Sequence, residues 1–344
     1  MNRPELDIDA LRQRLPAWPG TEQSNPELDQ LLAIFGADFH RTRNAVQYRC
    51  SHFASSCYQL VAHYWLRENS KGTVLVVHGY FDHIPLYRRV IDYLLEHGFS
   101  VAGFDLPGHG LSSGRRASIP DFGLYQRVLR DFLALLSSSD LPAPFHAVAQ
   151  STGGAITMQY LLECSRNNET PLFEGSVLLA PLVKPMGWRL AFIVQPLLSL
   201  FVGKIPRTFT PNSHDEDFLT LLRMEDPMQS DFTDIIWVGA MKRWVRQFLK
   251  MPPSQYAPLV VQGTLDFTVE WRTNLPVIEQ KFPNAKFLRI EHAHHQLVNE
   301  STEYLQPILA ATLEHFCQSQ APFMQDEDDI FYPEAAAQGE HSEV

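Results

Sequence analysis

The sequence predicts an α/β fold built on a mostly parallel, doubly wound sheet with an inserted helical cap. Three observations predict this fold. Short apolar runs recur along the chain, helix-length amphipathic segments separate them, and one long interval interrupts the alternation. The chain has 344 residues, of which 45% are hydrophobic and 19% charged, so it can bury one large core and still carry an insertion.

The apolar runs are the predicted strands of the sheet. Each run is rich in Val, Leu, Ile, Phe or Ala and is bounded by Gly, Pro or polar residues. Such runs fit strands that are buried on both faces of a parallel sheet. They are Thr73–Val77, Ser100–Asp105, Phe145–Ala149, Ser176–Ala180, Pro258–Gln262 and Ala285–Ile290.

Amphipathic segments between and after these runs are the predicted helices, and their alternation with strands implies right-handed crossovers. They are Leu86–His97, Phe122–Leu136, Thr152–Cys164, Trp271–Phe282 and Thr302–Phe316. Ahead of the first run, Val46–Cys50 and Gln59–Trp65 alternate loosely in polarity. We expect these two segments to form a hairpin that adds antiparallel strands at one edge of the sheet.

Changes in composition divide the chain into four parts. Residues 1–40 are Pro-rich and predict an irregular lead-in, while 41–185 and 255–318 predict the α/β core. Residues 186–254 contain no clean strand but two apolar stretches with helical periodicity, which predicts a helical cap, or lid, above the sheet. Residues 319–344 are acidic and predict a disordered tail.

Charge and hydropathy exclude several classes of protein. The net charge of −11 argues against a nucleic-acid surface, which requires clustered Lys and Arg. No apolar signal segment follows the first residues, and the stretch Leu190–Gly203, which contains Pro196, is shorter than the ~20 residues of a membrane span. The four cysteines form no CxxC pair and suggest no disulfide framework. We therefore expect a cytoplasmic protein, with peripheral membrane contact as an option.

The segment FHAVAQSTGGAITMQY carries the strongest chemical signal. A predicted strand ends at Ala149, Ser151 follows at once, and a helix begins near Gly153. This is the strand–turn–helix setting of a nucleophile elbow, whose usual pattern is GxSxG with small residues two positions to either side of the serine. Here those residues are Ala149 and Gly153. The alternative is a serine that merely caps a helix.

A serine hydroxyl needs a base to act as a nucleophile. His292, His294 and His295 follow the last predicted strand, and only one of them can serve. Asp266 follows Pro258–Gln262, the predicted strand that precedes the last one. Singly, Asp266 could stabilise a turn and the histidines could belong to a polar surface loop. Their order, Ser then Asp then His at successive strand ends, instead favours a catalytic triad.

Backbone donors for a developing oxyanion are also suggested. His78 and Gly79 directly follow a predicted strand, and a glycine there lets the next N–H turn toward the site. The backbone N–H groups of Tyr80 and Thr152 are the candidates for the oxyanion hole. The alternative is an ordinary β-turn glycine.

Taken together, the segments HGYFDHIPLY, DLPGHGLSSG, AQSTGG, QGTLDFTV and HHQLVNE occur in an order that resembles the monoacylglycerol lipase and lysophospholipase branch of the α/β-hydrolases, with serine aminopeptidase S33-type members. The resemblance covers roughly 73–185 and 258–300. It implies an α/β-hydrolase fold and selects His295, which is followed by QLVNE, as the base. It also implies that the loop beginning at Asp105 is structural support. The departures are Ala149 at the elbow and the bulky pair Tyr80-Phe81 at the oxyanion turn.

The resemblance implies a serine hydrolase of carboxylic esters, acting on monoacylglycerol- or lysophospholipid-type lipids through an acyl-enzyme on Ser151. No cofactor is implied, and no metal, because the histidine spacings lack a HExxH or finger pattern. Open alternatives are an amide, peptide or thioester hydrolase, an acyltransferase, and a non-catalytic binding member of the fold. The cap segment Trp188–Val202 either packs over the sheet or rests on lipid and admits an acyl chain.

Overall fold

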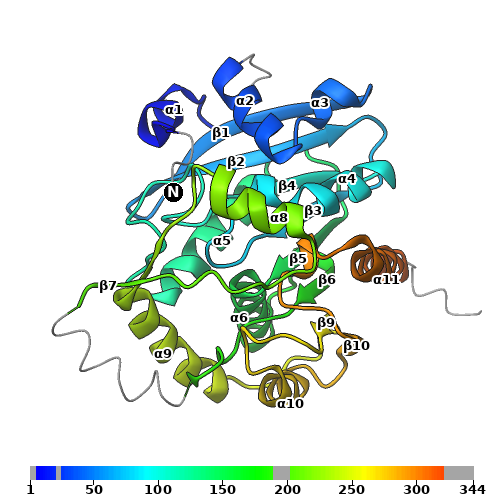
Figure 1. Ribbon diagram of the computed structural model, residues 1–344. Coiled ribbons are helices and arrows are strands. Elements are labelled where there is room, and N and C mark those ends of the chain that lie inside the picture. The colour runs from blue at the N-terminus through cyan, green and yellow to red at the C-terminus, as the bar shows by residue number, and fades with distance from the viewer. Residues whose placement is uncertain (1–4, 21–24, 189–201, 321–344) are drawn as a thin grey trace, which may run out of the picture.

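The computed structural model describes residues 5–20, 25–188 and 202–320 (Figure 1). Its centre is an eight-stranded sheet in the order β1-β2-β4-β3-β5-β6-β9-β10. In this sheet the pairs β1–β2 and β2–β4 are antiparallel, and all other neighbouring strands are parallel. The bounds are β1 Val46–Ser55, β2 Tyr58–Arg67, β3 Thr73–Val77, β4 Ser100–Phe104, β5 Phe145–Gln150, β6 Phe173–Leu179, β9 Leu259–Gly263 and β10 Lys286–Ile290.

This architecture confirms the predicted α/β fold with an antiparallel hairpin at one edge. The strand order also creates a switch point, because the chain leaves β3 for β4 on one side and then crosses to β5 on the other. In open α/β sheets, ligands bind beside the carboxyl ends of the strands at such a switch point. The loops after β3 and β5 are those in which the sequence places the oxyanion turn and Ser151.

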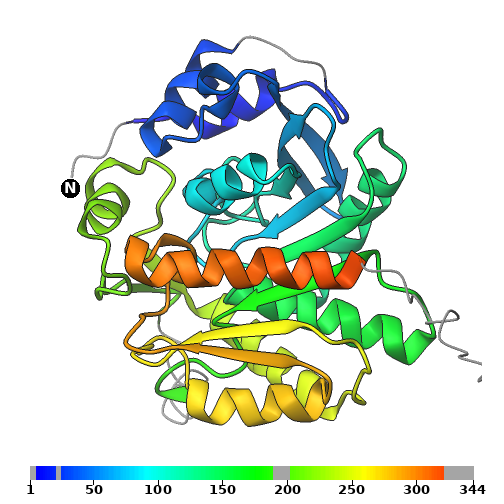
Figure 2. The same ribbon diagram turned by 90° about the vertical axis from the view of Figure 1, so that its right-hand side faces the viewer.

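Helices cover both faces of the sheet, because alternate side chains of each buried strand point to opposite faces. Val74 and Val76 pack with α4 (Arg88–Glu96) and α11 (Thr302–Gln320). Leu75 and Val77 pack on the other face. The helices there are α5 (Phe122–Ser137), α6 (Thr152–Asn167) and α10 (Trp271–Lys281). Figure 2 shows α11 running alongside the strands on the face turned toward the viewer.

The predicted irregular lead-in over 1–40 is wrong for much of its length. Residues Ile8–Arg14, Pro26–Phe35 and Phe39–Thr42 form α1, α2 and α3. In α2 the side chain of Asn25 accepts a hydrogen bond from the Leu28 N–H, and Pro26 occupies the first turn, where its missing donor costs nothing. Leu28, Leu31, Leu32 and Phe35 are buried at helical spacing. Pro26 therefore begins a helix here instead of breaking one.

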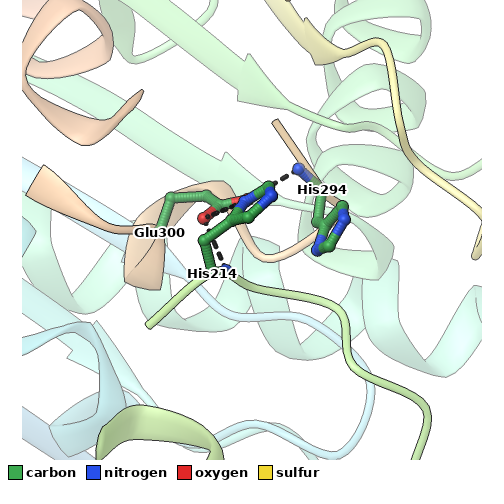
Figure 3. A group of neighbouring side chains, drawn as sticks. All are labelled: His214, His294 and Glu300. Carbon is green, nitrogen blue, oxygen red and sulfur yellow. Dashed lines mark hydrogen bonds and ion pairs between the residues drawn. The ribbon is translucent and has the colours of Figure 1, made fainter. Parts of the chain in front are cut away.

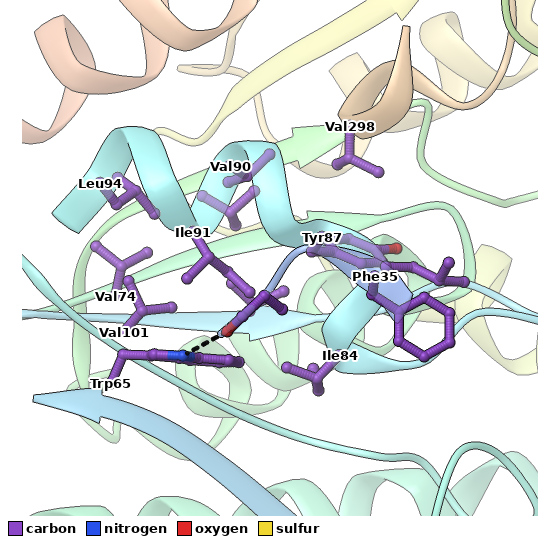
Figure 4. Packing of buried hydrophobic residues seen from close by; sticks show 14 of the residues in the cluster. Phe35, Trp65, Val74, Ile84, Tyr87, Val90, Ile91, Leu94, Val101 and Val298 are labelled. Carbon is purple, nitrogen blue, oxygen red and sulfur yellow. Dashed lines mark hydrogen bonds between the residues drawn. The ribbon is translucent and has the colours of Figure 1, made fainter. Parts of the chain in front are cut away.

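The α2 segment packs on the same side of the sheet as α4. Phe35 lies beside Ile84 and Tyr87, and the Trp65 indole N–H donates to the Ala37 carbonyl just after α2, at 3.2 Å (Figure 4). Burying side chains of this size contributes about 1.5–3 kcal/mol each. The N-terminal helices are thus part of the folded core.

The interval between β6 and β9 contains α8 (Glu216–Thr220), a π-helical turn (Leu221–Glu225) and α9 (Ile235–Lys250). The second predicted apolar stretch forms α9, whose Trp237 and Trp244 rings contact Phe122 of α5. In this interval, where the sequence shows no clean strand, a short ribbon forms in which β7 (Lys204–Pro206) pairs with β8 (Phe232–Asp234). Three-residue strands are too short to give a readable period.

Some predictions fall outside the described residues. Most of the first apolar cap stretch lies in 189–201, and nearly all of the predicted tail lies in 321–344. Helix α11 extends to Gln320, a few residues further than predicted. None of the helices in the described part of the chain combines the length and apolar character that a bilayer crossing would need.

Candidate active site

Ser151 lies between the end of β5 and the start of α6, in a conformation that L-residues rarely adopt. Its φ is 52° and its ψ is −109°. Such backbone strain persists only where the surroundings over-determine it. The Ser151 N–H donates to the Leu179 carbonyl at 2.9 Å, and the Ser151 carbonyl accepts from the N–H groups of Ala155 and Leu182, both at 3.0 Å. The elbow is therefore held from β6 and from α6.

The tightness of the elbow explains the small residue after it. A Cβ atom added to Gly153 would lie 2.0 Å from the carbonyl oxygen of Val77 in β3. That contact is impossible, so only glycine fits where α6 crosses the end of β3. Ala149, the residue that replaces the usual glycine before the serine, is fully buried, which is compatible with its small size.

Loops from three different strand ends bring Ser151, His295 and Asp266 together. His295 follows β10 and Asp266 follows β9. The Oγ atom of Ser151 lies 3.0 Å from Nε2 of His295, and Nδ1 of His295 lies 2.7 Å from Oδ2 of Asp266. Ser151 is 9% exposed, His295 5% and Asp266 2%, so the row is shielded from bulk water. The arrangement can pass a proton from the hydroxyl to the imidazole.

The carboxylate of Asp266 is fixed by groups around it. Oδ1 accepts from the N–H groups of Thr268 at 2.7 Å and Val269 at 3.1 Å, and Oδ2 accepts from Nε2 of Gln262 at 2.9 Å. Burial by itself raises the pKa of Asp266, but the charge of His295 and these hydrogen bonds outweigh burial and lower it. The carboxylate stays ionised beside the imidazole.

Two glutamines that sequence reasoning missed support the row. Gln150, at the end of β5, donates from Nε2 to the His295 carbonyl at 2.8 Å. Gln262, in β9, holds Asp266 as described. Each is a polar side chain near the carboxyl end of a buried strand, and each is almost completely buried. The sequence places each glutamine at the end of an apolar run, but it does not show that the side chain is buried.

The predicted oxyanion turn has the geometry of a tight turn beside Ser151. The Asp82 N–H donates to the Gly79 carbonyl at 3.2 Å, and Phe81 has a φ of 70°. A Cβ atom added to Gly79 would lie 3.5 Å from Cβ of Ser151. Tyr80 lines the same cavity as Ser151 and Thr152. As the first residue of α6, Thr152 also has an N–H with no acceptor inside the helix.

Side chains beneath the turn hold it in place. Nδ1–H of His78 donates to the Gly79 carbonyl at 2.8 Å, while its Nε2 accepts from the Leu106 N–H at 2.8 Å. Burial lowers the pKa of His78, which matches this neutral tautomer. Asp105 accepts from the backbone N–H groups of Ile84 at 2.9 Å and Leu111 at 2.8 Å. Asp105 therefore ties the loops after β3 and β4 together.

A cavity of about 290 Å³ opens at Ser151. Its apolar lining includes Leu182, Trp237 and Val269, and its polar lining includes Arg207 and Arg223 from the cap. The cavity could hold an ester with an apolar chain at the reacting serine.

Of the two competing histidines, His292 is exposed and His294 belongs to a separate cluster with His214 and Glu300 (Figure 3). The ligand atoms of these three residues lie within 4.8 Å of one another. The two imidazoles stack with centroids 4.0 Å apart and planes 20° apart, so their in-plane lone pairs do not converge on one ion. The Glu300 carboxylate accepts hydrogen bonds from the backbone N–H groups of His294 at 2.6 Å and His214 at 2.8 Å. This cluster, which we name the cap clasp, joins the cap to the His295 loop.

Comparison with known proteins places these features in context. The family model described as serine aminopeptidase, S33 matches residues 68–302. An uncharacterised abhydrolase domain-containing protein of Dictyostelium discoideum is 24% identical, over 67% of this chain but only 24% of its own length. The match thus spans about a quarter of that relative. A monoglyceride lipase of Mus musculus is 24% identical over 73% of this chain and 84% of its own.

Among solved structures, a soluble variant of monoglyceride lipase from Saccharomyces cerevisiae in complex with a substrate analog superposes with a TM-score of 0.65. The sequences are 15% identical, and the match covers 80% of this chain and 97% of the yeast chain. At this identity the similarity establishes the shared fold.

Proposed function

The chain belongs to the serine aminopeptidase S33 family, in the monoglyceride lipase-like branch of the α/β-hydrolases, and on this premise we propose that it hydrolyses carboxylic esters through an acyl-enzyme on Ser151. One observation carries the proposal: Ser151, His295 and Asp266 form a hydrogen-bonded row with separations of 3.0 and 2.7 Å. The proposed substrates are lipid esters of the monoacylglycerol or lysophospholipid type.

In the first step, Oγ of Ser151 attacks the ester carbonyl while Nε2 of His295 accepts its proton. Asp266 holds the imidazole by Nδ1 and stabilises the cation that forms. The N–H groups of Tyr80 and Thr152 donate to the oxyanion, and donors of this kind contribute about 2.7–4 kcal/mol each to transition-state stabilisation. His295 then protonates the leaving alcohol, which departs and leaves an acyl-serine.

The second step returns the serine to its free state. Water enters, His295 removes its proton, and the resulting nucleophile attacks the acyl carbonyl. The tetrahedral intermediate collapses, Ser151 recovers its proton from His295, and the carboxylic acid leaves. Every group required is present in the row and at the two backbone donors, so the residues of this chain account for both steps.

The charge of the cavity favours esters over peptides with a free amino terminus. An aminopeptidase substrate carries an ammonium group, which the guanidinium groups of Arg207 and Arg223 would repel. The one carboxylate among the described lining residues, Asp82, accepts from the Tyr87 hydroxyl at 2.9 Å and from Gln296 at 2.8 Å. The cavity therefore provides little negative charge to bind an ammonium group.

Exposed apolar side chains on the cap support contact with a lipid surface as part of the proposal. Ile205 and Phe232 on the β7–β8 ribbon are 38% and 46% exposed, and Ile236 at the start of α9 is 44% exposed. Ile205 pairs with Thr233 and Phe232 pairs with Pro206, so the two side chains leave opposite faces of the ribbon. Exposed apolar side chains on both of its faces favour insertion of the ribbon among lipid headgroups. The chain after β7 leads directly to Arg207 in the cavity lining.

A series of p-nitrophenyl esters of increasing chain length, run beside aminoacyl amides, tests the proposal. The wild type is expected to turn over esters and not amides. Ser151→Ala should reduce turnover by several orders of magnitude, whereas Ser165→Ala, an exposed serine on the same helix, should retain it. With long-chain esters presented in vesicles, Phe232→Ser should have lower turnover than the wild type. On dissolved short esters the two should have equal turnover. Full ester turnover by Ser151→Ala would rule out the nucleophile.

A further inference from the structure

The bulky pair at the oxyanion turn has a structural use that the hydrolytic mechanism does not require. The Tyr80 ring stacks on Trp237 of α9, with centroids 3.9 Å apart and planes 21° apart, and its hydroxyl donates to the Ala117 carbonyl at 2.7 Å. Phe81, the next residue, contacts a cap residue, Arg207. The pair therefore joins the oxyanion turn to the cap.

Arg207 contacts two aromatic rings. Its guanidinium carbon is 3.9 Å from the ring centroid of Phe81 and 4.3 Å from that of Phe209. Contacts within about 6 Å attract a cation to the face of a ring. The guanidinium of Arg207 therefore contacts one ring on the oxyanion turn and one ring of the cap.

A glutamine fixes the same guanidinium from its edge. Gln229 accepts from Nη1 of Arg207 at 2.5 Å, and its own amide nitrogen donates to the Phe81 carbonyl at 2.9 Å and to Asp226 at 2.7 Å. Asp226 is fully buried and contacts His83 at 3.0 Å. Arg207 is thus held beside Phe81, the residue that follows the proposed oxyanion donor Tyr80.

A second cation lines the same cavity. Arg223, from the π-helical turn of the cap, donates from Nη2 to the Phe209 carbonyl at 3.3 Å. Both guanidinium groups belong to the cap, whereas the apolar lining residues Leu182 and Val269 belong to the core. The lining of the cavity at Ser151 therefore combines two cationic side chains with apolar ones.

We propose that Arg207 and Arg223 form a subsite for a phosphate in the alcohol part of the ester, so that the preferred substrates are lysophospholipids with an anionic headgroup. The inference rests on the proposed function and narrows its substrate class. A planar guanidinium binds phosphate oxygens through two parallel hydrogen bonds, which makes arginine suited to this task.

The position of Arg207 favours phosphate over other anions. In a lysophospholipid only a glycerol unit separates the ester from the phosphate, so the anion must bind near the reacting carbonyl. Arg207 packs on Phe81, one residue after the proposed oxyanion donor. A carboxylate at the far end of an acyl chain would lie many bonds away from the ester.

The test compares decanoyl-glycerol with decanoyl-glycerol-3-phosphate, both below their aggregation concentrations. The wild type is expected to have the higher kcat/KM for the phosphate ester. Arg207→Gln should lower the phosphate-to-neutral ratio of kcat/KM about tenfold or more, mainly through KM, since charge-assisted hydrogen bonds are worth about that much. The ratio for Arg207→Lys should lie between those of the wild type and Arg207→Gln. Arg223→Gln should also lower the ratio.

Arg272→Gln is the matched control, because Arg272 also lies on an aromatic ring, 4.4 Å from Trp271, but is exposed and outside the cavity. Its ratio should equal that of the wild type. A p-nitrophenyl hydrogen dicarboxylate adds an arm with the anion on the acyl chain.

Three results would overturn the subsite. The wild type could show no preference for phosphate, Arg207→Gln could lower both substrates equally, or the dicarboxylate could show the larger dependence on Arg207. Failure of the proposed function is distinct from all of these. In that case neither glycerol ester is hydrolysed and a fluorophosphonate does not label Ser151.

Discussion

At the residue scale, the candidate site depends on a few side chains whose protonation and backbone conformation are set by their neighbours. Ser151 has a φ of 52° because β6 and α6 both bond to its peptide groups. Asp266 accepts two backbone N–H groups and a glutamine amide, so its second oxygen faces His295 in one orientation. Activity should therefore be sensitive to changes that preserve shape and alter only a charge.

Asp266→Asn is such a change. The amide keeps the size of the carboxylate but presents a donor to one of its neighbours, which favours the wrong imidazole tautomer. Loss of the orienting carboxylate lowers kcat by about 10⁴ in a serine protease triad. We expect a fall of similar order for short esters, measured by steady-state kinetics. A fall of less than tenfold would show that His295 does not depend on Asp266.

The same variant has an expected pH dependence in stability. The pKa of Asp266 is lowered in the folded protein, so its ionised form adds stability at pH values above the ordinary carboxyl pKa of about 3.9. That contribution is lost as the pH falls through the lower folded-state pKa. The difference in unfolding free energy between wild type and Asp266→Asn, measured in urea, should therefore be largest near neutral pH and shrink under acid. A difference that grows under acid would contradict this sign.

The sequence predicted the three residues of the row, but it could not predict the residues that support them. Ser, Asp and His are rare enough at successive strand ends to be noticed. Gln150 directly follows one predicted run and Gln262 ends another, and only the fold shows that they bond to His295 and Asp266.

At the element scale, the cap and the His295 loop are joined by several bonds through the cap clasp. Besides its contacts with His294 and His214, Glu300 accepts from the Ser301 N–H at 3.1 Å. Nearby, the Gln296 N–H donates to the Asn212 carbonyl at 2.8 Å. Glu300 is fully buried, so its hydrogen bonds do not compete with water. The clasp therefore couples the position of the cap to that of His295.

Glu300→Gln tests this coupling. One carboxylate oxygen becomes an NH₂ group, which cannot accept from a backbone N–H, so at least one buried donor loses its partner. We expect the unfolding free energy to fall by about 1–3 kcal/mol and kcat to fall with it. Glu303→Gln, on the exposed side of α11, is the control and should change neither. Unchanged kcat in folded Glu300→Gln would separate the clasp from catalysis.

Helices and strands could be predicted where an unbroken apolar or amphipathic run spans the whole element. The strand β3 begins and ends where its apolar run does, and the predicted α10 differs from the observed helix by one residue. The helix α2 was missed because the prolines of 1–40 suggested irregular chain, although Leu28, Leu31, Leu32 and Phe35 have helical spacing. The strands β7 and β8 are set by pairing across the cap, which no local pattern reveals.

At the scale of the whole molecule, the sheet order determines where chemistry can occur. The loops after β3, β5, β9 and β10 meet at one edge because these strands are parallel, and the cap covers that edge with Arg207 and Trp237 in the cavity wall. Parallel strands could be inferred from the alternation of runs and helices. The cap's contribution could not, because its residues reach the cavity only through tertiary packing.

The central claim is that residues 151, 266 and 295 act as one unit, with His295 as the base. It is tested most directly by the rate at which a fluorophosphonate labels Ser151, followed by intact-protein mass spectrometry in folded His295→Ala and His294→Phe. The second variant keeps the ring that stacks on His214 while removing its nitrogens. Labelling should slow by several orders of magnitude in His295→Ala and by much less in His294→Phe. Wild-type labelling by His295→Ala, or the reverse order of the two variants, would contradict the account.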